Sequence, residues 1–176
     1  MEIPEPMSFK NGLMYGRPDA IVNYNGGEKF VLEFKERTGY VYKKYLHRYA
    51  SVSAVEPSVY SQLQTYIDTA GLNKALLIVS PADFAMLQNS MRKNKAWGEN
   101  YNLPPFHLEW VERNNSHIDY LAERANTIKE MIKLETPPRR EYSGIPIGLN
   151  GKKTFPCGYC VYNFTCTKEY GFGNRT

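Results

Sequence analysis

Two carboxylates and a lysine stand in two short motifs near the beginning of the sequence. Gly16-Arg17-Pro18-Asp19 holds the first acid, and Glu33-Phe34-Lys35 holds the second acid and the lysine. Two carboxylates can hold a hard divalent cation through their oxygen atoms. Such a cation can activate water and neutralise charge on a phosphodiester. A neighbouring lysine can orient that water or stabilise the developing charge. These residue types therefore suit hydrolysis at a metal site, provided that the chain brings them together.

Residues 17–24 and 28–35 are the elements that must position these side chains. Both runs are rich in aliphatic and aromatic residues, which suit strands, and they flank Asn25-Gly26-Gly27. A short link that contains glycine is typical of a hairpin. If these three residues form the whole loop, Tyr24 faces Glu28.

In this register Asp19 lies opposite Glu33, with their Cβ atoms about 5 Å apart on one face of the hairpin. Lys35 is two residues beyond Glu33 and therefore points to the same face. A two-residue loop would instead place Asp19 opposite Phe34 and break the site, because a slip of one residue reverses the faces. An ordinary hairpin with a charged solvent face is the alternative.

Residues 57–70 predict a helix that could complete the site. Pro57 suits the first turn, and Gly71 suits the position just beyond the end. Apolar residues recur at helical spacing between them. Gln62 and Tyr66 are four residues apart, so they are neighbours on one side of the helix. Taken alone, Tyr66 also fits a core position and Gln62 a solvated one.

Together these motifs resemble the PD-(D/E)xK nuclease core in its RecB-like exonuclease branch: they are Pro18-Asp19, Glu33-x-Lys35 and Gln62-x-x-x-Tyr66. The resemblance implies a metal-dependent DNA nuclease that hydrolyses phosphodiester bonds. It assigns Mg²⁺ or Mn²⁺ binding to Asp19 and Glu33, with the Phe34 carbonyl. It also implies that Lys35 positions or activates the attacking water, while the helical glutamine and tyrosine help to place the DNA or the lysine.

The substrate that the resemblance implies is DNA with free ends or in single-stranded form, cut by an exonuclease. Two other functions stay open. The chain could be a non-catalytic DNA-binding or assembly subunit of a nuclease complex, or a structure-specific endonuclease on the same fold. The presence of Asp19, Glu33 and Lys35 together favours catalysis.

All three cysteines of the chain lie within one short segment, as Cys157, Cys160 and Cys166. Clustered thiolates are soft ligands suited to zinc or to iron–sulfur clusters. The arrangement is similar to the C-terminal cysteine run of RecB-like nucleases that carry a 4Fe–4S cluster, including the CRISPR-adaptation and helicase-associated nucleases. In those proteins the fourth cysteine usually lies upstream of the nuclease core, whereas here no cysteine precedes Cys157.

Iron–sulfur and zinc sites normally use four protein ligands, so three interpretations of the cysteine segment remain. It binds a cluster with a non-cysteine or external fourth ligand; it binds zinc completed by His47, His107 or His117; or it binds no metal and its thiols are buried or loose. The family's usual N-terminal region is also absent ahead of the first predicted strand near Leu13, and a protein partner could supply it.

Residues 37–55 form a basic and aromatic segment between the second predicted strand and the helix. Its basic residues are Arg37, Lys43, Lys44 and Arg48, interleaved with Tyr40, Tyr42, Tyr45 and Tyr49. Basic groups bind phosphates, and aromatic faces can stack on unpaired bases. The expected DNA contacts are Arg17, Arg37, Tyr42, Lys43, Lys44 and Arg48. A surface helix with solvated lysines is the alternative.

The 176 residues fit a single domain, with residues 139–176 as a cysteine-containing C-terminal tail. With 42% hydrophobic and 23% charged residues, the chain can bury a core and stay soluble. The net charge of +4 is modest. No signal peptide or transmembrane run is present, so we expect a cytoplasmic protein without membrane contact.

The order of predicted elements indicates an α/β fold. Residues 75–79 and 106–111 predict two further strands, and residues 83–94 and 118–134 predict two further helices. The order β-β-α-β-α-β-α fits a mixed β-sheet flanked by helices. The resemblance implies that this sheet is restriction-endonuclease-like.

Overall fold

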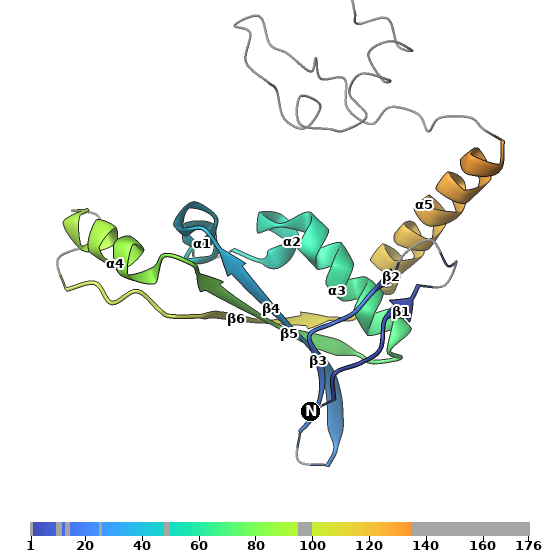
Figure 1. Ribbon diagram of the computed structural model, residues 1–176, viewed down its shortest axis with the longest axis horizontal. Helices are drawn as coiled ribbons and strands as arrows, with labels where there is room; N and C mark the ends of the chain where they lie inside the picture. Colours follow the sequence, from blue (N-terminus) through green and yellow to red (C-terminus); the bar gives the residue numbers. More distant parts are fainter. Residues whose placement is uncertain are drawn as a thin grey trace, which may run out of the picture. The chain divides into compact units, whose positions relative to one another are not determined.

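A four-stranded sheet lies at the centre of the described chain (Figure 1). The computed structural model describes residues 2–9, 12, 15–24, 26–47, 50–94 and 100–134. In chain order the elements are β1 (Met7–Ser8), β2 (Tyr15–Gly16), β3 (Ala20–Tyr24), β4 (Glu28–Arg37), α1 (Gly39–Tyr45), α2 (Val52–Val55), α3 (Pro57–Thr69), β5 (Lys74–Pro81), α4 (Phe84–Lys93), β6 (His107–Glu112) and α5 (Asn115–Lys133).

The chain divides into two units, Met1–Lys133 and Leu134–Thr176. All the described helices and strands belong to the first unit. The predicted tail, residues 139–176, lies outside the described residues, so a single domain that ends in this tail stays a prediction. Among the described helices, none is both long and apolar enough to span a membrane.

The sheet is mixed, with the strand order β3-β4-β5-β6. Strand β4 runs antiparallel to β3 and parallel to β5, and β6 runs antiparallel to β5. A parallel neighbour requires a long crossover connection, and here α1, α2 and α3 supply it. The predicted α/β fold, a mixed sheet flanked by helices, is confirmed.

The β3–β4 hairpin has the register that its loop predicts. Tyr24 pairs with Glu28, so three residues link the strands. Within that loop Gly26 has φ +72°, a left-handed conformation that glycine adopts without steric cost. Continued one step beyond the end of β3, the same register places Asp19 opposite Glu33.

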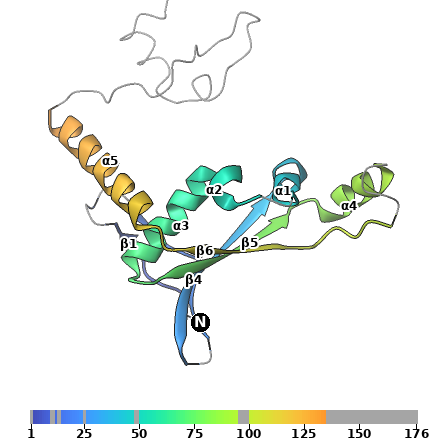
Figure 2. The same cartoon turned by 180° about the vertical axis from the view of Figure 1, so that it is seen from behind.

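Helices cover one face of the sheet. On β5 the side chains alternate, and Ala75, Leu77 and Val79 are fully buried. They belong to one core cluster with Leu63 and Ile67 of α3. Figures 1 and 2 show α1, α2 and α3 together on this side of the sheet. Helix α3 begins at Pro57, as predicted, because proline suits the first helical turn.

The sequence predicts neither the small ribbon formed by β1 and β2 nor the division of residues 37–55 into the two short helices α1 and α2. In the ribbon Met7 pairs with Gly16. Such short elements have no reliable sequence signal, because a two-residue strand or a single helical turn depends on tertiary contacts rather than on its own propensity. The basic segment, for which the sequence leaves a surface helix as the alternative to a DNA-binding segment, contains the two helices α1 and α2.

Candidate functional site

Glu33 and Lys35 lie on the helix-covered face of β4. Glu33 is 3% exposed, and its Oε1 accepts a hydrogen bond from Lys35 Nζ at 2.5 Å. Its other oxygen, Oε2, is buried and meets no hydrogen-bond partner among the described residues. A buried oxygen without a partner costs free energy. The Oε2 atom of Glu33 is therefore suited to bind a cation.

Asp19 reaches the same strand through its side chain. Its Oδ2 accepts the Phe34 N–H at 2.7 Å. Since β3 begins only at Ala20 and Pro18 has no amide hydrogen, the carboxylate takes the place of a strand partner. The N–H and C=O of one strand residue point to the same edge, so the Phe34 carbonyl is directed to the edge where Asp19 lies.

Asp19, Glu33 and the Phe34 carbonyl offer oxygen atoms alone, which is the donor set that Mg²⁺ and Mn²⁺ accept. In the part of the chain that the structure describes, no group of three or more His, Cys, Asp or Glu side chains could hold a metal. Among the described residues, the side-chain contribution is thus two carboxylates. Magnesium usually keeps several water ligands, so a set of this size fits it.

Burial raises the pKa of Glu33 above its ordinary value. The hydrogen bond and charge of Lys35 lower this pKa, while the negative charge of Asp19 raises it and an Asp19 backbone contact lowers it. Because the net direction is upward, the ionised form of Glu33 is disfavoured where it lies. A nearby dication would reverse that balance, since an opposite charge favours the carboxylate.

The predicted pair on α3 is joined by a hydrogen bond from Gln62 Nε2 to the Tyr66 hydroxyl at 2.8 Å. Tyr66 is 6% exposed, and its ring packs so closely on Gly16 that a Cβ there would lie 2.6 Å from the ring carbon Cε1. Gly16 precedes Asp19 by three residues, so Tyr66 supports the segment that carries the first acid. Among the described residues, no hydrogen bond joins this pair to the two acids or the lysine.

Arg37, a predicted DNA contact, forms an ion pair within the protein. Its Nε lies 2.9 Å from Glu56 Oε1, and the Tyr45 hydroxyl donates to Glu56 Oε2 at 2.8 Å. Burial, together with Glu56, raises the pKa of Tyr45, so this hydroxyl keeps its proton. The sequence reasoning missed Glu56, for which the available signal is an acid placed directly before the helix-starting Pro57.

Tyr42 is a core residue, which contradicts its predicted role in binding DNA. Its side chain is 0% exposed, and its hydroxyl donates to the Pro104 carbonyl at 2.8 Å. Burial raises the pKa of Tyr42 to about 12. The prediction was wrong because Gly39, Tyr42 and Tyr45 recur at helical spacing and form the buried side of α1.

The opposite side of α1 is a basic and aromatic surface, as the sequence predicts for this segment. Tyr40 is 75% exposed, and Lys44 Nζ lies 4.9 Å from the centre of its ring. Lys43 and, ahead of β3, Arg17 are exposed as well. The structure thus leaves these side chains accessible to phosphates, whereas Arg48 lies outside the described residues.

The predicted cluster ligands Cys157, Cys160 and Cys166 also lie outside the described residues. Of the histidines proposed to complete a zinc site, His107 Nε2 lies 3.3 Å from Glu109 Oε2 and His117 Nε2 lies 3.0 Å from Ser61 Oγ. His47 is exposed. Both interpretations of the cysteine segment as a metal site therefore stay predictions.

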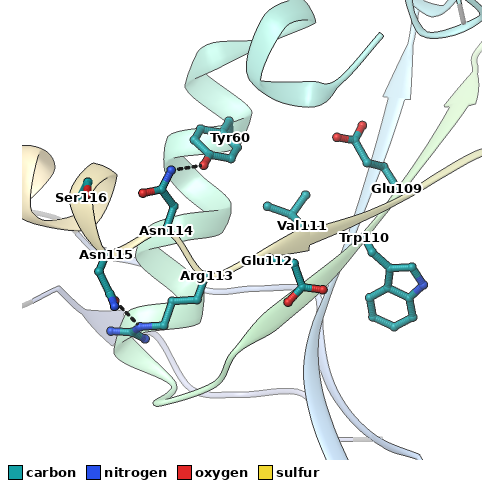
Figure 3. A pocket seen from close by; sticks show the side chains of 9 residues that line it. All are labelled: Tyr60, Glu109, Trp110, Val111, Glu112, Arg113, Asn114, Asn115 and Ser116. Atoms are coloured by element: carbon teal, nitrogen blue, oxygen red, sulfur yellow. Dashed lines mark hydrogen bonds between the residues drawn. The ribbon is translucent and has the colours of Figure 1, made fainter. Parts of the chain in front are cut away.

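A hollow of about 430 Å³ lies beside β6, and Figure 3 shows the side chains around it. It is lined by Tyr60 of α3 and by residues 109–116. Asn114 Nδ2 donates to the Tyr60 hydroxyl across it at 3.0 Å. Its lining includes none of the predicted catalytic residues, so it is distinct from the site on β4.

Comparisons with known proteins add little to this geometry. No family model matches the chain. A search of curated proteins also finds no match. Among solved structures, the crystal structure of SSO0001 is 17% identical in sequence, with a TM-score of 0.44. The alignment covers 93% of this chain and 57% of that chain, so this chain spans less than two thirds of its length. At this TM-score the likeness supports no argument about fold or function.

Proposed function

We propose that this chain is a metal-dependent nuclease that hydrolyses phosphodiester bonds in DNA. The observation that carries the proposal is the hairpin register, which brings the carboxylates of Asp19 and Glu33 to one strand. Lys35 is hydrogen-bonded to Glu33, whose second oxygen is buried without a partner among the described residues. Two acids and a lysine in this arrangement suit hydrolysis assisted by a divalent cation.

Mg²⁺ or Mn²⁺ bound here would activate water and neutralise charge on the phosphate. Asp19 and Glu33, with the Phe34 carbonyl, would hold it. The Lys35 side chain is 21% exposed, so its Nζ can donate a hydrogen bond to a water molecule or a phosphate oxygen beside Glu33. The buried position of Glu33 keeps bulk water away from its carboxylate and strengthens its electrostatic interactions.

The surroundings of the site support DNA as the substrate. Helix α1 begins at Gly39, two residues after β4 ends, and it carries the exposed Tyr40, Lys43 and Lys44. Amines can bind the phosphates of a strand, and an exposed ring can stack on an unpaired base. We therefore propose a preference for single strands or free ends, and thus an exonuclease. Gln62 and Tyr66 would position the segment before Asp19 rather than touch the cation.

The cysteine segment extends the proposal to a second metal. Its three thiols would hold an iron–sulfur cluster or zinc in a structural role, with a fourth ligand from elsewhere. Clustered thiols stay reduced in the cytoplasm, which is the location that we propose.

A nuclease assay with substitutions at the site tests this proposal. We expect the wild type to degrade labelled linear DNA with Mg²⁺ or Mn²⁺, and Asp19→Asn and Lys35→Met to lose about 100-fold or more in rate. Glu36→Gln is the matched control, because Glu36 is an exposed acid on the same strand. Equal residual activity in all four proteins would show that the cleavage comes from a contaminant.

The same assay separates the two rival functions. A non-catalytic DNA-binding or assembly subunit is favoured by one observation, namely that fewer than three acidic, histidine or cysteine side chains converge in the described chain. Under that alternative the wild type would shift labelled DNA in a gel but leave it intact. A structure-specific endonuclease would cut circular DNA that contains its target structure, whereas a circle resists an end-dependent enzyme.

A further inference from the structure

Strand β6 lies at an edge of the sheet, and β5 is its only neighbouring strand among the described elements. The Arg113 N–H bonds to the Asn73 carbonyl on the β5 side at 2.8 Å. Backbone groups alternate between the two edges of a strand. The N–H and C=O groups at even-numbered positions, such as Leu108 and Trp110, therefore point to the outer edge.

One end of this outer edge is occupied by a buried glutamine. Gln64 of α3 is 0% exposed, and its Nε2 donates to the Glu112 carbonyl at 2.7 Å. Its Oε1 accepts the Asn114 N–H at 2.8 Å. The Gln64 side chain thus binds the Glu112 carbonyl and the Asn114 N–H. A neighbouring strand would bind the same two backbone groups.

The segment before β6 is fixed in the same way. Gln88 of α4 donates from Nε2 to the Tyr101 carbonyl and accepts the Leu103 N–H on Oε1. The Tyr42 hydroxyl donates a hydrogen bond to the Pro104 carbonyl. Between these contacts, the outward backbone groups at positions 106, 108 and 110 have no described strand beside them.

The same stretch presents a row of large apolar side chains. Phe106, Leu108 and Trp110 are 51%, 62% and 50% exposed. They occupy alternate positions, so they lie on one face, and the row is symmetric about Leu108. Edge strands usually carry charges, prolines or bulges at such positions to prevent pairing. An edge with exposed apolar side chains is typical of an interaction surface.

We propose that two copies of this chain pair antiparallel through β6, about a two-fold axis at Leu108. Leu108 then lies opposite Leu108 of the second copy, and Phe106 lies opposite Trp110 of the second copy. On the helix-covered face, Glu109 lies opposite His107 of the second copy. Moving the axis to Glu109 would place two carboxylates directly opposite each other, which is destabilising.

This self-complementary pattern favours a second copy over an unrelated peptide. A two-fold interface requires that each residue of the row meet a matching residue of the same row, and the symmetric spacing of the apolar residues meets that requirement. In Figure 3 Trp110 and Glu112 point away from Tyr60, while Glu109 and Val111 point toward it.

Sedimentation velocity over a range of concentrations tests the pairing, and it does not depend on the catalytic proposal. A pairing of two edge strands is a small interface, so we expect association in the range of about 1–100 µM. Leu108→Lys and Leu108→Glu should each be monomeric, because position 108 faces itself and like charges repel. An equimolar mixture of the two should associate again, since lysine then meets glutamate.

Ile132→Lys is the matched control, because Ile132 is an equally apolar side chain that is 64% exposed on α5. It should associate as the wild type does. Circular dichroism and thermal unfolding check that every variant is folded, and Leu108→Thr, a milder polar change, replaces any charged variant that is not. A wild type that stays monomeric throughout overturns the proposal, as does a Leu108→Lys dimer as stable as the wild type. Folded charged variants that fail to associate when mixed overturn the two-fold register.

Discussion

Glu33 is a buried acid between a lysine and a second acid, and its surroundings disfavour its own charge. Lys35 offsets part of this effect, but Asp19 acts against it. Functional sites commonly hold groups that reduce the stability of the free protein. A cation at this position would bring the missing positive charge, so metal binding and folding stability are coupled at one side chain.

Glu33→Gln should therefore raise the melting temperature of the metal-free protein at neutral pH, because the amide stays neutral where the ionised carboxylate is disfavoured. In the folded protein the pKa of Glu33 is raised above its ordinary value of 4.5. Protonated Glu33 therefore contributes its full stabilisation below pH 4.5. It is lost as the pH rises through the folded-state pKa. The gain of the variant over the wild type should thus be larger at about pH 7 than at about pH 4.

Differential scanning calorimetry at these two pH values, with a chelator present, measures the difference. Glu36→Gln serves as the control, since this acid is exposed. Added Mg²⁺ should stabilise the wild type but not Glu33→Gln. A melting temperature at neutral pH that falls below that of the wild type would contradict the expected sign.

Individual residues also show which features of the site the sequence predicts and which it does not. The acids and the lysine could be found because a hairpin with alternating faces fixes which side chains share a side. The burial of Tyr42 and the ion pair between Arg37 and Glu56 were missed, since both depend on how α1 and α2 pack on the rest of the protein. Residue type alone does not tell a tyrosine that packs in the core from one that stacks on a base.

At the scale of elements, the hairpin, α3, β5, α4, β6 and α5 follow from local signals. These signals are local: a loop that contains glycine, a proline at the start of a helix, and apolar residues at a regular spacing. The ribbon of β1 and β2 depends instead on contacts between distant residues, and α3 contributes to it, because the Tyr66 ring lies against Gly16. This contact explains the glycine at the start of the first motif.

Gly16→Ala should destabilise the protein by about 1–3 kcal/mol, because the added Cβ would lie 2.6 Å from the Tyr66 ring and packed surroundings tolerate such overlap poorly. It should also slow cleavage, since the segment that leads to Asp19 must shift. Urea unfolding and the nuclease assay measure the two effects.

Gly27→Ala is the matched control for this substitution. A Cβ at Gly27 would meet only the Tyr24 carbonyl, at 3.9 Å, which is an ordinary contact. It should leave both stability and rate close to those of the wild type. An unfolding midpoint for Gly16→Ala equal to that of Gly27→Ala would show that Tyr66 moves aside without cost.

At the scale of the whole molecule, the two proposed metal sites belong to different units. Asp19 and Glu33 lie in Met1–Lys133, whereas the cysteines lie in Leu134–Thr176. A structural cluster in the second unit would stabilise that unit without taking part in cleavage. The chemistry of the two metals should therefore be separable by substitution.

Protein purified without oxygen should be brown and should contain iron and sulfide, near four of each per chain for a complete cluster. Cys160→Ser should lose the colour and the iron, whereas Asp19→Asn should keep both. Metal analysis and the visible absorption spectrum measure this. Colourless protein that carries zinc, or no metal, would contradict the cluster assignment.

The crossover between β4 and β5 also has a consequence for the order of folding. The turn that brings Asp19 and Glu33 together closes over few residues, so its contacts can form early and at little entropic cost. The parallel pairing of β4 with β5 and the contact of Tyr66 with Gly16 join residues that are far apart in the sequence. Contacts of this kind form more slowly, because a long loop must close first. We therefore expect the two acids to meet before the helix that supports them is in place, and we expect the site to become rigid only when the crossover is complete.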